Sequence, residues 1–403
     1  MLKFDYEARD PSTGKHVKAT VEAESERTAA KLLMDQGYVP INITEQSQKG
    51  GFLGFFANRI STKDRVVFTR QLSTLISAGL PLTQSLHTVV DQTENKRLKS
   101  VTQDILTSVE AGNSLSNAFG KHPDVFDKVY IALIASGETS GTLDKALERV
   151  ADQQEKDAEM MSKIKGALVY PVIVLVVIFL VLGFMLFTVV PQVEKLYVDL
   201  RRELPFITAI LVGTADFVIQ FWWVILLVAI AAGYFIQQYL STDNGQRFKD
   251  NLKLNFPIFG ELFRKLYMAR FMRTGQTLMA TGVPLLDTLR ISARAVNNSV
   301  ISDSILRSSE KVKGGKGLAD SLKNEPYILP LVPQMLQVGE QSGRIDEMMG
   351  KTASVYESEL DTTIKSISTA IEPILMVVLA LIAGLMVAAI LLPIYGLVET
   401  IRT

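Results

Sequence analysis

The pattern of apolar and polar positions divides the chain into polar helical stretches and three long apolar blocks. The blocks occupy residues 169–190, 217–236 and 371–392, and the first of them carries no charged residue. A helix of about 22 residues that rises about 1.5 Å per residue is about 33 Å long, and a bilayer has a hydrocarbon core of about 30 Å. The pattern therefore predicts three transmembrane helices, although Gln220 makes the limits of the second one uncertain.

The sequence around the first apolar block returns 202 residues later, and an upstream part returns at an offset of 203. The paired segments are GETSG (137–141) with GEQSG (339–343), Tyr170-Pro171 with Glu372-Pro373, and AGLPL (78–82) with TGVPL (281–285). Such order predicts an internal duplication, in which each copy is a polar helical unit joined to a membrane helix.

Glycine, proline and capping residues divide each copy into short helices. In the first copy, Ser61 and Asp64 form an approximate capping box, Gly79 stops a helix, and Pro81 suits the first turn of the next. A long helix after Gly141 then carries one apolar stripe towards the membrane. The pattern predicts roughly six helices per copy, which is an α-bundle rather than an α/β unit.

The expected fold is therefore mainly α and integral to a membrane, with a small ββαβ module at the amino end. That module is indicated by alternating apolar residues, a helical stretch after Ser25 and a third alternating stretch at 39–44. The expected parts are the module (1–46), a linker (47–60), a first bundle (61–168), a span (169–190), an external or periplasmic loop (191–216), a span (217–236), a second bundle (237–370), a span (371–392) and an external tail (393–403).

Charge asymmetry predicts the orientation of these parts. The stretch 237–273 carries seven basic residues, whereas 191–216 carries three. Because basic residues concentrate on the cytoplasmic side, we expect both bundles and the amino end in the cytoplasm of a multi-pass protein. The opening MLKFDYEARD lacks an apolar region, so we expect no signal peptide and entry through the internal segments.

Composition argues against most kinds of chemistry. A net charge of zero indicates no bulk attraction to nucleic acid, and the absence of cysteine excludes thiolate chemistry. His16, His87 and His122 lie in different contexts, and no Walker A pattern occurs, so we expect no metal, no cofactor and no enzyme. Charge-free interiors in the first and third spans also give a transporter little support.

Glu138 and Glu340 occupy the same place in the two repeated turns and allow two interpretations. In the structural one, the glycines end one helix, Ser140 or Thr142 and Ser342 cap the next, and the carboxylate lies near helix amides. In the functional one, these residues contact a partner.

A second set of candidates marks the entry to the membrane. Its members are Tyr170, Pro171, Glu372, Pro373, Pro191 and Pro393. The prolines are expected to bend or bound the spans, with a motion-transmitting hinge as the alternative. Glu372 is expected to reach the interface, with a polar contact between protomers as the alternative. The acidic run of Glu155, Asp157 and Glu159 suits a solvated helix face, with cation binding as the alternative.

These motifs resemble the type II secretion system protein F family, which includes the inner-membrane platforms of type IV pilus machines. The resemblance is carried by the repeated Gly-Glu-x-Ser-Gly turn, by KGALVYP (165–171) with a second proline at 191, and by FTRQLSTLISAGLPLTQSL (68–86) with its counterpart at 271–289. It covers nearly the whole chain. Glu372, where the first copy has Tyr170, departs from the internal pattern and makes the register there less secure.

The resemblance implies a homo-oligomeric platform in the bacterial cytoplasmic (inner) membrane. Its expected partners are a hexameric assembly ATPase in the cytoplasm, pilin or pseudopilin subunits, other inner-membrane components of the machine, and lipid. The expected function is pilus assembly driven by that ATPase, and the alternative within the family is type II secretion. A membrane signalling scaffold or a transporter remains the alternative from another class.

Overall fold

The computed structural model describes residues 2–9, 16–23, 26–35, 39–45, 59–199, 206–257 and 259–401. At the amino end, strands β1 (Leu2–Arg9), β2 (His16–Ala23) and β3 (Val39–Glu45) form an antiparallel sheet in the order β2-β1-β3. Helix α1 (Glu26–Asp35) lies between β2 and β3 in the chain and buries Leu33. Most of the linker expected at 47–60 falls outside the described residues.

Two helical repeats follow; five of their six helices begin at matched positions, and α12 begins earlier than its counterpart α3. The first repeat consists of α3 (Thr62–Ser77), α4 (Leu82–Gln92), α5 (Lys96–Glu110), α6 (Leu115–Gly120), α7 (Lys128–Ser140) and α8 (Leu143–Phe184). The second consists of α12 (Phe259–Ala280), α13 (Leu285–Ala295), α14 (Ser299–Lys313), α15 (Leu318–Leu322), α16 (Leu331–Ser342) and α17 (Ile345–Ile401). The duplication read from the sequence is therefore a duplication of six helices.

The turns between these helices use the same residues for the same reasons. Gly79 and Gly282 have φ of 85° and 87°, in the left-handed region that glycine enters without steric cost. Pro81 and Pro284 then stand at the N-cap of the following helices α4 and α13. Ser61 caps α3 through the reciprocal hydrogen bonds expected with Asp64.

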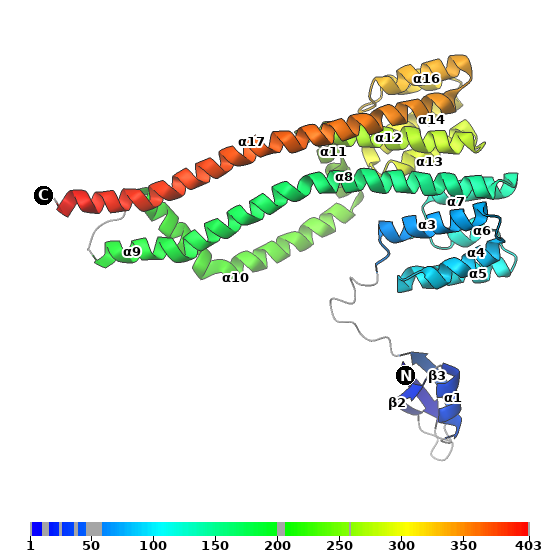
Figure 1. Ribbon diagram of the computed structural model, residues 1–403, viewed down its shortest axis with the longest axis horizontal. Coiled ribbons are helices and arrows are strands. Elements are labelled where there is room, and N and C mark those ends of the chain that lie inside the picture. The colour runs from blue at the N-terminus through cyan, green and yellow to red at the C-terminus, as the bar shows by residue number, and fades with distance from the viewer. Residues whose placement is uncertain are drawn as a thin grey trace.

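Each repeat has its own apolar core, and both bundles lie at one end of the molecule (Figure 1). The long helices α8 and α17 leave that end side by side and run in the same direction. Met160 and Ile164 of α8 belong to the core of the second repeat, and Leu278 of α12 belongs to the core of the first. The two bundles are therefore packed together rather than linked only by the chain.

Three helical segments are long and apolar enough to cross a membrane. They run over Leu143–Asp199, Val212–Ser241 and Ile345–Gly384, so each contains all or part of one expected span. The middle segment belongs to α10 (Phe206–Ser241), in which Phe221 has non-helical angles that mark a kink. Helix α11 (Asp243–Asn255) then leads into the second repeat.

The connection expected at 191–216 is largely helical. A π-helical segment, η1 (Met185–Val189), continues from α8 into α9 (Val190–Asp199), and α10 begins at Phe206. Val190 packs with Val212 and Ala215, so an apolar contact between α9 and α10 stabilises this hairpin. The residues expected to connect the two spans outside are therefore helical rather than irregular over 190–199 and 206–216.

The prolines expected to bend or bound the spans lie within helices. Pro171 lies inside α8, and Pro373 and Pro393 lie inside α17, which continues through Ile401. Pro191 is the second residue of α9, directly after the π-helical segment. A π turn widens the helix locally, which relieves the clash between a proline ring and the carbonyl of the preceding turn.

Candidate functional site

The repeated Gly-Glu-x-Ser-Gly turn holds three helices together in each repeat. Its last glycine, Gly141 or Gly343, adopts φ of 69° or 68° and ends α7 or α16. Its first glycine lies against the following helix, because a Cβ on Gly137 would stand 2.4 Å from Ala146 Cβ and one on Gly339 would stand 2.9 Å from Ile345 Cα. The two glycines thus allow a reversal of direction and a close approach of the helices.

The glutamate of the turn caps a helix that lies more than twenty residues earlier in the chain. Glu138 accepts hydrogen bonds from the backbone amides of Leu115 and Ser116 and from the Ser116 hydroxyl, at the start of α6. Glu340 accepts hydrogen bonds from the amides of Leu318 (2.5 Å) and Ala319 (3.1 Å), at the start of α15. A carboxylate in this place satisfies orphan amides and interacts favourably with the positive end of the helix.

The expected capping role of the serines was wrong. The hydroxyls of Ser140 and Ser342 donate back to the carbonyls of Ser136 and Val338, both at 2.8 Å, in the helix that is ending. Thr142 is the N-cap of α8 but makes no side-chain capping hydrogen bond. The carboxylate does lie against helix amides, but those amides belong to α6 and α15 rather than to the helices that follow the turn.

An arginine–glutamate pair fastens the first helix of each repeat to its long helix. Arg70 binds Glu155 through two hydrogen bonds of 2.6 Å, and Arg273 binds Glu357 through hydrogen bonds of 2.9 and 2.7 Å. The planar guanidinium matches a carboxylate in this two-point geometry, which makes the contact specific as well as strong. The hydrogen bonds from Arg70 hold the pKa of the Glu155 carboxyl below its ordinary value.

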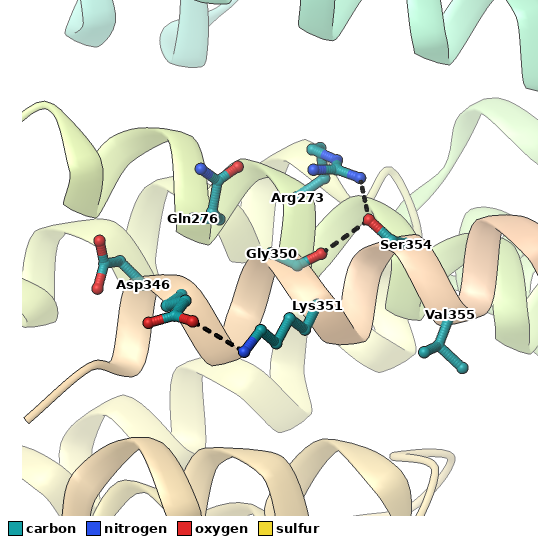
Figure 2. Close-up of a pocket in the computed structure, with 8 residues that line it drawn as sticks. Arg273, Gln276, Asp346, Gly350, Lys351, Ser354 and Val355 are labelled. Carbon is teal, nitrogen blue, oxygen red and sulfur yellow. Dashed lines mark hydrogen bonds and ion pairs between the residues drawn. The ribbon is translucent and has the colours of Figure 1, made fainter. Parts of the chain in front are cut away.

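Beside the pair in the second repeat lies an open groove of about 620 Å³ between α12 and α17 (Figure 2). Arg273 and Gln276 from α12 line it, together with residues of the first turns of α17 that end at Val355. Ser354 accepts a hydrogen bond of 3.1 Å from Arg273, and Lys351 forms an ion pair of 2.8 Å with Glu347. Lys351 and Glu347 of this lining are thus paired with each other, whereas Arg273 is held by Ser354 and by Glu357.

The two repeats meet through helices α7 and α8 of the first and α12, α13 and α17 of the second. The Ser136 hydroxyl donates to the Thr281 carbonyl at 2.7 Å, and the Thr277 hydroxyl donates to Gln153 at 3.5 Å. Further along the same contact, Arg270 lies 3.6 Å from Asp157. Val283, which precedes α13, and Ile291 of α13 pack against the core of the first repeat, so the contact combines polar pairs with apolar burial.

The three carboxylates of the acidic run on α8 form ion pairs with three different basic side chains. Glu155 pairs with Arg70, Asp157 with Arg270, and Glu159 with Lys163 at 2.9 Å. Burial raises the pKa of the Asp157 carboxyl, although the nearby Arg270 opposes this rise. Among the described residues, no group of three or more His, Asp or Glu side chains is arranged to hold a metal ion.

Two of the membrane-entry residues occupy corresponding exposed places on the long helices. Tyr170 is exposed near the start of the first apolar block of α8, and Glu372 is exposed at the corresponding place in α17. Pro171 and Pro373 follow them inside the same helices. The side chain of Pro393 lies outside the described residues.

Several of these contacts escaped the sequence analysis, although the repeat contained a signal for one of them. Arg70 and Arg273 occupy the same position in the two copies, as do Glu155 and Glu357. A charged pair that survives in both copies indicates a shared contact, but 85 residues separate Arg70 from Glu155, and no local periodicity connects them.

The fold and the repeated turn define a class: membrane proteins built from two copies of a helical bundle, each continuous with its own membrane helix. Comparison with known families agrees with this class. Residues 68–191 and 271–393 match the family described as Type II secretion system (T2SS), protein F, and residues 1–44 match the N-terminal domain of the same family. The chain therefore belongs to the type II secretion system protein F family.

Relatives in both branches of the family match along their whole length. The type IV pilus assembly protein PilC of Thermus thermophilus is 37% identical over 405 residues, which cover 100% of this chain and 99% of that protein. PilC of Myxococcus xanthus is 34% identical over 99% of this chain and 96% of its own length. The type II secretion system protein F of Pseudomonas aeruginosa is 34% identical over 98% of this chain and 99% of its own length.

Proposed function

We propose that this chain is the inner-membrane platform of a type IV pilus assembly machine, which couples a cytoplasmic assembly ATPase to the insertion of pilin subunits into the filament. The whole-length match to relatives named for pilus assembly supports this proposal. A type II secretion platform that works on pseudopilins is the second candidate, because relatives named for secretion match almost as well.

The continuity of α8 and α17 carries the mechanical part of the proposal. Each helix starts at a glycine turn beside its bundle and continues without interruption into an apolar segment. Lys163 of α8 forms an ion pair of 2.9 Å with Asp361 of α17, which ties the two helices together before they enter the membrane. A displacement of the bundles by the ATPase would therefore reach the spans and deliver a pilin from the bilayer.

We propose further that both bundles face the cytoplasm. They lie at the same end of the long helices (Figure 1), and the two spans between them return the chain to the same side of the membrane. The excess of basic residues at 237–273 supports a cytoplasmic position for that end. Protease attack on intact spheroplasts tests this orientation: we expect the bundles to be protected, and cleavage inside either bundle would contradict the proposal.

A flexible glycine-serine insertion after Lys163 tests the coupling. We expect filaments to disappear while the variant still accumulates in the membrane, because the insertion separates the bundle from the span. The matched control places the same insertion after Asn113, in the turn between α5 and α6, where no span depends on helix continuity. Normal filaments with the insertion after Lys163 would show that rigid coupling is wrong.

Two further measurements separate the candidate functions. Deletion of the protein should leave unassembled pilins in the membrane if the chain serves a pilus, and unsecreted substrate if it serves secretion. The purified chain should bind the assembly ATPase in either case. A signalling scaffold would do neither and would respond to a ligand without any filament.

A further inference from the structure

Exposed apolar side chains are rare on the two bundles. Within residues 59–165 and 259–367, only three large hydrophobic side chains are strongly exposed: Val67 (44%), Val338 (50%) and Val355 (42%). Phe248, Leu252 and Phe256 are also exposed, but they lie on or directly after α11, which precedes the second repeat and has no counterpart in the first. Single exposed apolar residues are ordinary, but these three occupy related places in the internal repeat. The counterpart of each valine in the other repeat takes part in the contact between the two repeats.

The offset between the copies identifies these places. Val338 corresponds to Ser136, and Val355 corresponds to Gln153, both at an offset of 202. Ser136 and Gln153 form the face of the first repeat that receives α12 through Thr281 and Thr277. The same face of the second repeat, on α16 and α17, is left uncovered in the single chain.

The helix face that docks on this surface, on α12, also has a counterpart in the first repeat, on α3. Arg270 and Thr277 of α12 and Thr281, directly after its end, lie on the first repeat. At an offset of 203 their counterparts are Val67 and Thr74 of α3 and Ala78, directly after its end. Residues with spacings of seven and four lie on one face of a helix. Thr277 is 5% exposed, whereas Thr74 and Ala78 are exposed.

Three positions carry polar residues on the covered face and apolar residues on the uncovered face of the other repeat. Where the internal contact uses Ser136, Gln153 and Arg270, the uncovered faces carry three valines. Polar residues would be expected on a surface that stays in water, so the apolar replacements indicate a surface that becomes covered.

We propose that a second copy of this chain covers these faces, with α3 of one copy docked on α16 and α17 of the next, as α12 is docked on α7 and α8 within the chain. The contact is head-to-tail, because the donor face belongs to the first repeat and the receiving face to the second. Charge agrees with this arrangement: the internal pair Lys163–Asp361 has as its counterparts Lys365 and Glu159, which carry the same opposite signs.

The membrane is compatible with this arrangement. Helices α8 and α17 point in the same direction (Figure 1), so the operation that relates the repeats keeps the direction of the spans. A second copy placed by the same operation therefore has its spans in the same bilayer. A head-to-tail contact of this kind closes into a ring if the rotation divides a full turn. The proposal concerns how copies meet and goes beyond the proposed function, whichever filament the protein serves.

Cross-linking of engineered cysteines tests the proposal, since the natural chain contains none. Full-length Thr74→Cys and Val355→Cys variants carrying different epitope tags are co-expressed, and purified membranes are treated with a short bis-maleimide. We expect cross-linked dimers that carry both tags, and little product when either variant is expressed alone. A Thr107→Cys variant, exposed on α5 away from both faces, replaces Thr74→Cys as the control and should give no mixed dimer.

A third substitution distinguishes docking from chance collision. Val338→Lys, introduced into the Val355→Cys chain, should reduce the mixed dimer at least tenfold while the protein level in the membrane stays unchanged. Dimers from Thr74→Cys alone would show a symmetric contact through α3 and overturn the proposal. So would the absence of mixed dimers when a Gln153→Cys, Thr277→Cys chain cross-links internally under the same conditions.

Discussion

The carboxylate of Glu340 gives the most direct test of how the repeated turn is held. Helix α15 begins at Leu318, and its N-cap residue, Gly317, has no side chain that could cap it. The carboxylate accepts from both the Leu318 and Ala319 amides, so Glu340→Gln replaces one accepting oxygen with an NH₂ group that faces a donor. The substitution removes one charge-assisted hydrogen bond, about 1.5–3 kcal/mol, and the charge at the helix end, about 0.3–1 kcal/mol.

The sum, about 2–4 kcal/mol, predicts that opening of α15 becomes at least about 30-fold more frequent, because about 1.4 kcal/mol corresponds to a factor of ten. Hydrogen exchange of the full chain in detergent, followed by mass spectrometry of peptides covering 314–323, measures this opening directly. Glu310→Gln makes the same chemical change on the exposed surface of α14 and should leave exchange at 314–323 unchanged. Equal exchange in the two variants would refute the capping role of Glu340.

Three further predictions concern packing, ion pairing and pH. Gly339→Ala places a Cβ 2.9 Å from the Ile345 backbone and should destabilise the chain by about 1–3 kcal/mol in thermal unfolding, whereas Gly166→Ala, with no neighbour within 4 Å, should be neutral or slightly stabilising. Arg273→Lys keeps the charge but loses the two-point contact with Glu357, so denaturant unfolding should show a loss of about 1.5 kcal/mol, while Arg344→Lys on the exposed surface should show no comparable loss. Loss of hydration would raise the pKa of Glu325, but hydrogen bonds from Lys311 and Arg307 outweigh it and hold the pKa below the ordinary value of 4.5. The unfolded state then binds the proton first, so the stability from this group is present above about pH 4.5 and is lost as the pH falls below it. Denaturant unfolding over a pH series should therefore show a smaller acid loss in Glu325→Gln, and an unchanged acid loss would contradict the assignment.

The sequence predicted those parts of the fold that depend on residues close together in the chain. Gly79 and Gly282 marked the turns because glycine alone enters the left-handed region without cost, and the apolar blocks marked the spans by length and composition. The repeat then allowed one copy to support the interpretation of the other. The helical nature of 190–199 was missed because charged residues interrupt its apolar pattern, although Val190 and Tyr197, seven residues apart, are both buried.

The parts that could not be predicted depend on contacts between distant segments. Glu138 was recognised as a member of the turn, but its partners lie in α6, and nothing in the local sequence selects that helix over α8. The prolines were expected to bend or bound the spans because proline removes a hydrogen bond, but the local sequence does not show that α8 continues through Pro171. Which face of each bundle meets the other repeat became visible only when the two copies were compared in three dimensions.

Because α8 is continuous from the bundle into the apolar segment, a small rotation at the bundle produces a larger displacement at its far end. Its 42 residues extend over about 63 Å, so a rotation of about 5° at the bundle moves the far end sideways by about 5 Å, close to the pitch of one helical turn. A rotation too small to repack the bundle therefore causes a larger displacement at the far end of the helix. That displacement is large enough for neighbouring helices to shift their contact by one row of side chains.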